Sequence, residues 1–117
     1  MSQYETEVTE GVFPLGGVND FSGTSYMNTL VNDPDVPVTV ANVSFEPGVR
    51  NNWHKHNGGF QIILATAGEG WYQEEGKPPV KLRTGDVAVA KDGVKHWHGA
   101  TADSWFSHLV ITAGTAE

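Results

Sequence analysis

The 117-residue sequence contains no cysteine, which excludes disulfides and thiolate metal ligands. Any bound metal must therefore use nitrogen and oxygen ligands. Basic residues are scarce, because 7 Lys and Arg stand against 14 Asp and Glu, for a formal net charge of −7. This charge disfavours nucleic acid and anionic membrane surfaces as partners. No apolar run has the length of a membrane span, and the N-terminus lacks a basic-then-apolar signal pattern, so we expect a cytoplasmic protein.

Helical periodicity is also missing, since Gly, Pro and Asn interrupt the chain repeatedly. The length suits one domain, residues 1–117. Short strands separated by turn residues predict an all-β sandwich or barrel. We expect residues 21–31 to form a strand, whereas residues 1–11 fit an edge strand and a loosely held terminus equally well. The other expected strands are 36–45, 60–65, 68–73, 80–83, 87–90, 96–100 and 104–112.

Two pairs of histidines carry the strongest chemical signal. On a strand, residues two apart face the same side, so His54 and His56 are expected to point together. Paired imidazoles suit a borderline divalent metal, although such pairs also occur on surface strands. Gln61 begins an apolar run, where a buried amide needs a partner such as a metal; a surface amide is the alternative. A second pair, His96 and His98, favours the metal interpretation.

The two stretches together resemble the paired motifs of the cupin family. The first motif is matched in spacing by Gly48, His54, His56, Gln61 and Gly68, and the second by Gly85, Lys91, Gly93, His96 and Ala100. Three residue types depart from the family pattern, and Gln61 in place of Glu matters most because it removes a negative charge. The resemblance covers about residues 40–112, the expected core of the metal site. It implies a double-stranded β-helix, a jelly-roll barrel with a metal inside its mouth.

The resemblance implies a metal site made of three imidazoles and one amide oxygen, from His54, His56, Gln61 and His96. Such neutral ligands leave the charge of the cation uncancelled, which favours a strong Lewis acid. The segments GEGWYQEEGKP, GDV, VKHWHGA and DSWFSHL are similar to a subgroup of small bacterial cupins. That subgroup includes manganese-dependent hydroxynitrile lyases and cupins found beside carboxymuconolactone decarboxylase-like proteins. The narrower resemblance implies Mn(II), with Fe, Ni or Zn as alternatives.

The same resemblance implies roles for residues around the metal. His108 matches a cavity histidine and suits a general acid or base; a buried histidine bonded to backbone is the alternative. Ala41, Val43 and Thr112 match the pocket wall that contacts substrate. His98 is expected to be a fifth ligand, a hydrogen-bond partner of a ligand, or a substrate-contacting residue at the rim. A longer loop between His56 and Gln61 means that substrate choice need not carry over.

These residues lead us to expect a metal-dependent lyase of the hydroxynitrile lyase type, acting on a small molecule. A metal-dependent dioxygenase is one alternative, and a non-catalytic barrel that binds a small molecule is another. Small cupins are often dimers, and exposed strand edges give a physical reason to expect a homodimer here.

Overall fold

The computed structural model describes residues 21–22 and 25–116. This part of the chain forms nine strands and no helix, and so contains no helix able to cross a membrane. The strands are β1 (Phe21–Ser22), β2 (Ser25–Val31), β3 (Thr39–Phe45), β4 (Arg50–Asn51), β5 (His56–Glu74), β6 (Val80–Arg83), β7 (Val87–Ala90), β8 (His96–Ala100) and β9 (Phe106–Ala116). The all-β prediction is confirmed. The strand considered for residues 1–11 lies outside the described residues.

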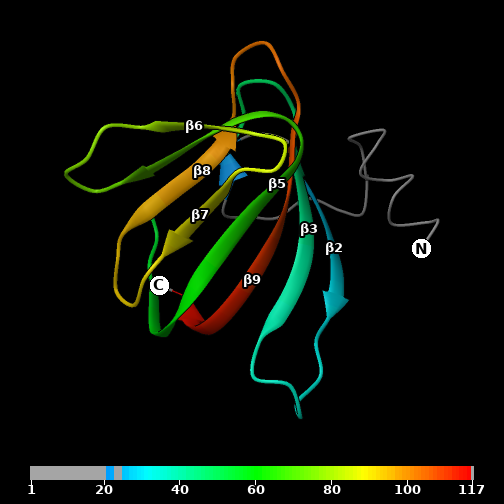
Figure 1. The fold of residues 1–117 in the computed structure, drawn as a ribbon, viewed down its shortest axis with the longest axis vertical. Coiled ribbons are helices and arrows are strands. Elements are labelled where there is room, and N and C mark those ends of the chain that lie inside the picture. The colour runs from blue at the N-terminus through cyan, green and yellow to red at the C-terminus, as the bar shows by residue number, and fades with distance from the viewer. Residues whose placement is uncertain (1–20, 23–24, 117) are drawn as a thin grey trace.

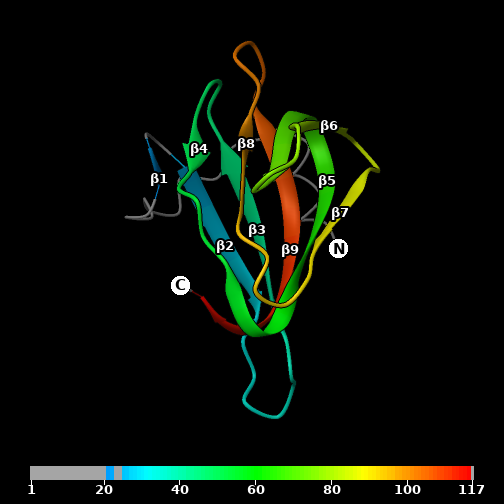
Figure 2. The ribbon, with the colours of Figure 1, turned by 90° about the vertical axis from the view of Figure 1, so that its left-hand side faces the viewer.

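One long strand, β5, belongs to both sheets of the molecule. Its first part pairs antiparallel with β7 and β9, and its last part pairs antiparallel with β6 and β8. Beyond β9 the first sheet continues through β3 to β2, and beyond β8 the second continues through β4 to β1. The two sheets curl around a shared interior (Figures 1 and 2). The result is the predicted jelly-roll barrel.

The prediction of two separate strands, 60–65 and 68–73, is wrong, because β5 runs through both without a break. Gly58 and Gly68 have φ angles of 79° and 73°. Gly58 lies within one irregularity in the pairing of β5 with β9, and Gly68 lies just beyond the other, which falls between Ala65 and Ala67. Glycine tolerates this conformation, so the strand bends instead of ending. A Cβ atom on Gly68 would lie 1.8 Å from the carbonyl oxygen of Trp105. A side chain here would collide with the β8–β9 loop, so glycine allows the loop to pack against β5.

The strand predicted at 36–45 begins at Thr39 instead. Residues before it form a turn, in which the N–H of Val36 donates to the carbonyl of Asp33 at 2.9 Å. The Asp33 carboxylate also accepts a hydrogen bond from the N–H of Asp35, as aspartates in turns commonly do. This local bonding competes with strand pairing and delays the start of β3.

Two further boundaries differ from prediction. The strand expected at 104–112 begins at Phe106 and extends to Ala116, because its end pairs with the start of β5. The strand expected at 21–31 is divided into β1 and β2, which pair with β4 and β3 respectively. The expected strands at 80–83, 87–90 and 96–100 are confirmed with the same bounds.

Alternating residues of β3, β5 and β9 share buried faces. On β3 and β9 the intervening Asn42, Ser44 and Ser107 are buried as well, each at most 1% exposed. The buried members of the shared faces are Ala41, Val43, Phe45, Gln61, Ile63, Ala65, Phe106, His108 and Val110, each at most 8% exposed. Register places these side chains in layers, since Phe45 pairs with Phe106 and Val43 pairs with His108. The layer nearest the β8–β9 loop is therefore aromatic, and the layers beyond it carry imidazoles.

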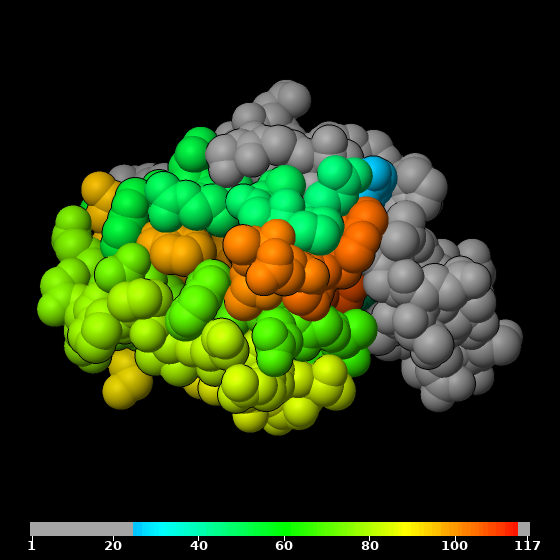
Figure 3. Space-filling view, turned by 90° about the horizontal axis from the view of Figure 1, so that it is seen from above, coloured from blue at the N-terminus to red at the C-terminus, as the bar shows by residue number. Residues whose placement is uncertain are grey.

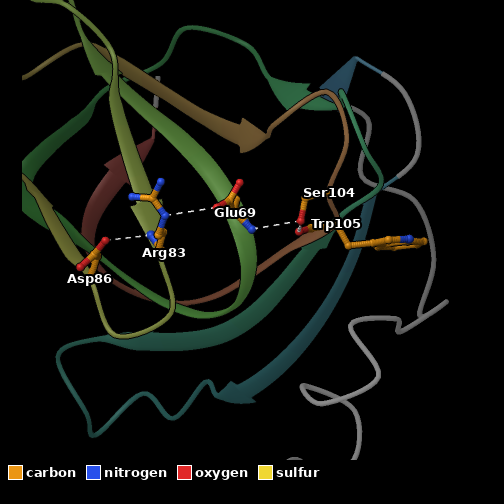
Figure 4. A network of polar contacts seen from close by, with 5 residues as sticks. All are labelled: Glu69, Arg83, Asp86, Ser104 and Trp105. Carbon is orange, nitrogen blue, oxygen red and sulfur yellow. Dashed lines mark hydrogen bonds and ion pairs between the residues drawn. The ribbon is translucent and has the colours of Figure 1, made fainter.

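The aromatic end of the barrel is closed by the β8–β9 loop. The N–H of Thr101 donates to the carbonyl of Glu69 at 3.1 Å, and its own carbonyl accepts the N–H of Gly48 at 2.9 Å. The side chains of this loop pack between the β3–β4 turn and β5 (Figure 3). The backbone N–H of Glu69 also donates to the hydroxyl of Ser104, and its carboxylate accepts a hydrogen bond from Nε of Arg83, both at 3.2 Å (Figure 4). Loop and sheet are therefore joined by several bonds at this end.

Substitution of two adjacent isoleucines on β5 tests which face of the strand is buried. Ile63 is 0% exposed, whereas Ile62 lies half-buried on the outer face. We expect Ile63→Ala to lower the free energy of unfolding in urea by about 2–5 kcal/mol, because it removes core contacts and leaves a cavity. The matched Ile62→Ala change should cost clearly less. Equal losses for the two variants would contradict the assigned faces.

Candidate metal centre

Three histidines converge inside the barrel, toward the end away from the β8–β9 loop. Their ligand-capable atoms, from His54, His56 and His96, all lie within 4.8 Å of one another. His54 forms an isolated bridge with His96, in which each backbone N–H donates to the other's carbonyl at 2.8–2.9 Å. His56 is the first residue of β5 and His96 the first of β8. The backbone pairing of two chain segments therefore assembles the group.

The sequence placed His54 and His56 together on one strand, and this detail is wrong. His54 precedes β5 and pairs with β8, whereas His56 begins β5. Their rings nevertheless converge, with centroids 5.2 Å apart in an edge-to-face arrangement. The two rings are close to each other, as predicted, but not because the two residues alternate along one strand.

Backbone carbonyls fix which ring nitrogen is available on two of the histidines. The Nδ1–H of His54 donates to the carbonyl of Asn52 at 2.7 Å, and that of His96 donates to the carbonyl of Val94 at 3.0 Å. A neutral imidazole that donates from Nδ1 carries its lone pair on Nε2. Both rings thus present Nε2 as the ligand atom.

Within the described part of the chain, neither ring nitrogen of His56 meets the geometry of a hydrogen bond, although the residue is only 5% exposed. A buried polar group left unsatisfied costs about 1–3 kcal/mol, so native proteins rarely tolerate one without a function. A cation beside His54 and His96 would satisfy His56. The orphaned ring is therefore one observation in favour of a bound metal.

Gln61 supplies a second observation. Its Oε1 lies 2.9 Å from Nε2 of His96, while its Nε2 donates to Oγ1 of Thr112 at 3.2 Å. Burial lowers the pKa of His96 to about 4, so at neutral pH this ring cannot donate from both nitrogens. Two lone pairs therefore face each other. A metal that binds both atoms at about 2.1 Å and at right angles holds them about 3 Å apart.

Electrostatics keep the ligands in the state that metal binding needs. Burial lowers the pKa of His56, and the neighbouring His54 lowers it further. Imidazoles must be neutral to bind a metal, so a lowered pKa favours binding at neutral pH. Three imidazole nitrogens and one amide oxygen fit a divalent transition metal, and the three-histidine group can hold such an ion.

Two further histidines lie beyond this group. Nδ1 of His98 is 3.1 Å from Nε2 of His108, and the two rings are 3% and 0% exposed. Burial lowers the pKa of His108 to about 4 and that of His98 well below its usual range, so both are neutral at neutral pH. Within the described part of the chain, the three-histidine group does not include His98. The structure shows His98 hydrogen-bonded to His108, which is not one of the proposed ligands, so the roles expected for His98 stay predictions.

The expected pocket residues lie on inward faces beside these histidines. Val43 pairs directly with His108 across β3 and β9, and Ala41 pairs with Val110 one step along. Thr112 pairs with Gln61 and accepts its amide N–H. Thr112 therefore orients a proposed ligand as well as lining the interior.

The sequence does not predict that Asn51 contacts a histidine. Its position fits a turn or a rim residue equally well, yet it is 4% exposed and bonded to His98. The contact depends on β4 pairing with β8 through Arg50 and Gly99, which no motif spacing encodes.

Known proteins identify the family. The family model for the cupin domain matches residues 41–112. The chain belongs to the cupin family. This cupin is 41% identical over 97 residues to an (R)-mandelonitrile lyase of Granulicella tundricola, covering 82% of this chain and 73% of that protein. It is 36% identical over 71 residues to an oxalate-binding protein of Thermotoga maritima, covering 61% and 58%.

Solved structures agree with the fold. A cupin-like protein of Thermotoga maritima superposes with a TM-score of 0.83 at 40% identity, covering 89% of this cupin and 82% of that chain. A predicted oxalate decarboxylase of the same organism superposes with a TM-score of 0.74 at 26% identity, covering 81% and 84%.

The hydroxyl of Thr112 offers a test of the Gln61 geometry. We expect Thr112→Val to weaken metal affinity about 10-fold or more, because the amide of Gln61 loses the bond that orients it. Competition titration with a chromogenic chelator measures the affinity. Thr29→Val, at an exposed position on β2, is the matched control and should leave affinity unchanged. Equal affinity in Thr112→Val and wild type would exclude Gln61 as an oriented ligand.

The lowered pKa values make stability depend on pH. In the metal-free protein the unfolded chain binds protons near pH 6.5, but folded His96 and His108 bind them only near pH 4. The free energy of unfolding should therefore fall as pH falls from about 6.5 to about 4. Urea titrations in the presence of a chelator measure this. A stability that stays level or rises on acidification across that range would show that these rings are not buried neutral.

Proposed function

We propose that this cupin is a metal-dependent lyase of the hydroxynitrile lyase type. The observation that carries the proposal is the set of four inward donor atoms together with a buried, neutral His108, whose hydrogen-bond partner His98 lies next to His54 and His96. The 41% identity to an (R)-mandelonitrile lyase supports the same chemistry. The reaction class would be cleavage, or formation, of the C–C bond between a cyanide group and a carbon that bears a hydroxyl.

His54, His56, Gln61 and His96 would hold the cation. A divalent cation, when bound there, supplies Lewis acidity toward a substrate oxygen. We propose Mn(II), with Fe, Ni or Zn as alternatives, because nitrogen and oxygen donors accept all four. The neutral ligand set leaves the positive charge uncancelled, which suits stabilisation of negative charge developing on oxygen.

His108 would move the proton. Its Nδ1–H faces the carbonyl of Leu109 at 3.3 Å, so its lone pair is on Nε2. In cleavage, Nε2 takes the proton of the substrate hydroxyl, replacing the N–H of His98 as its partner. The C–C bond electrons leave with cyanide, and the hydroxyl carbon becomes a carbonyl. Cyanide then takes the proton from His108, so the products are an aldehyde and hydrogen cyanide.

The inward face around His108 would set which substrates fit. Val43 is its direct cross-strand neighbour, and the small side chain of Ala41 lies in the next layer. We propose that these two residues, with Thr112 and His98, contact the substrate. Larger side chains at positions 41 and 43 would then restrict the size of the aldehyde.

Non-catalytic binding of a small molecule is a second candidate. The 36% identity to an oxalate-binding protein favours it, because a carboxylate oxygen can bind the same kind of cation. The two candidates differ in turnover. Oxalate bound to the metal-loaded protein, together with no release of aldehyde from any cyanohydrin, would favour the binding protein.

We also propose that the protein forms a homodimer. Val87 and Val89 on β7 are 52% and 46% exposed, and β7 pairs only with β5 in the described part of the chain. An edge strand with exposed apolar side chains is suited to association with a second copy. The cytoplasmic location and the lack of nucleic-acid partners remain predictions from the sequence.

Replacement of single histidines separates metal binding from proton transfer. We expect His96→Ala to lose metal and lyase activity together, because it removes a ligand. His108→Asn should keep the metal but lower kcat by about 100-fold or more, because it removes the base. Elemental analysis and aldehyde release from mandelonitrile measure the two properties. Protein purified without chelator that contains no transition metal would refute the proposal, as would full activity in His108→Asn.

A further inference from the structure

We propose that Asn51 is a positioning residue, which fixes the direction of a hydrogen-bond chain through His98 to His108. The chain runs through buried side chains from β4 to β9 and ends at a backbone carbonyl. It determines which nitrogen of His108 carries a proton. The inference rests on the proposed function only for its effect on rate, since the direction of the chain is a property of the protein itself.

The first link is set by the backbone. Oδ1 of Asn51 accepts the backbone N–H of His98 at 2.9 Å, which turns the amide so that Nδ2 faces the His98 ring. Nδ2 lies 3.0 Å from Nε2 of His98 and 3.4 Å from its Nδ1. An amide nitrogen only donates, so the ring nitrogen at the shorter distance, Nε2, carries the lone pair. The orientation of the amide therefore fixes the tautomer of the ring.

The remaining links follow from the first. Neutral His98 with a lone pair on Nε2 carries its hydrogen on Nδ1, which lies 3.1 Å from Nε2 of His108. His98 therefore donates to His108. The other end of the chain requires the same direction, because the carbonyl of Leu109 can only accept and faces Nδ1 of His108 at 3.3 Å. Both ends leave the lone pair of His108 on Nε2.

The packing of β4 on β8 holds Asn51 in place. A Cβ atom on Gly99 would lie 2.4 Å from Cβ of Arg50 and 2.6 Å from the carbonyl oxygen of Val49. Only glycine therefore allows β4 to approach β8 this closely. Asn51 is 4% exposed, so its amide is shielded from bulk water. The arrangement matters for rate because the base of the proposed reaction must present a lone pair, and Asn51 keeps that lone pair on one nitrogen.

Nitrogen NMR of the histidine rings tests the inference directly. In zinc-loaded, ¹⁵N-labelled wild-type protein, we expect Nε2 of both His98 and His108 to give the signal of an unprotonated nitrogen. Asn51→Asp keeps the shape and the acceptor for the His98 backbone N–H, but its carboxylate can only accept from the ring. Nε2 of His98 should then become protonated. Gln73→Glu is the matched control, because it adds the same charge on the outer face of β5 beside Trp97.

The rate provides a second measurement. We expect Asn51→Asp to lower kcat at least about 10-fold while KM and zinc content stay near wild type, and Gln73→Glu to change none of them. A wild-type spectrum with Nε2 of His98 protonated would overturn the inference, whether or not the variant folds. An unchanged ring pattern in folded Asn51→Asp would also overturn it. The expected ring signals in a protein without lyase activity would instead remove only the proposed function.

Discussion

The site depends on two lone pairs that face each other, one on Oε1 of Gln61 and one on Nε2 of His96, 2.9 Å apart. The ring is oriented by the carbonyl of Val94, and the amide nitrogen of Gln61 donates to the hydroxyl of Thr112. His56 lies beside them, buried, and neither of its ring nitrogens meets hydrogen-bond geometry within the described residues. In a low-dielectric interior this arrangement is repulsive and costly on its own, and a shared cation makes it favourable.

The barrel supplies the interior in which such a site can be held. All five histidines of the chain take part, and three of them are at most 3% exposed. The closed aromatic end, around Phe45 and Phe106, contributes apolar burial that offsets the cost of enclosing polar rings. β5 carries His56 and Gln61 and also belongs to both sheets. Disturbing this strand would therefore affect the fold and the site together.

Much of this architecture was predictable from local patterns. Alternation identified the inward faces of β3, β5 and β9, and histidine spacing identified residues that converge. Local reasoning was wrong where tertiary pairing overrides it. Glycines 58 and 68 bend β5 instead of ending it, because β9 and then β8 pair along its length. The link from Asn51 to His98 was not predictable, because it arises from the close antiparallel pairing of β4 with β8 at Gly99.

The most direct test of the account is a crystal of the manganese-loaded protein, measured at the manganese absorption edge. The account predicts one anomalous peak within bonding distance of Nε2 of His54, of His96 and of a ring nitrogen of His56, with Oε1 of Gln61 as the fourth contact. An anomalous map without a peak among these atoms, or with Gln61 turned away from the metal, would contradict it.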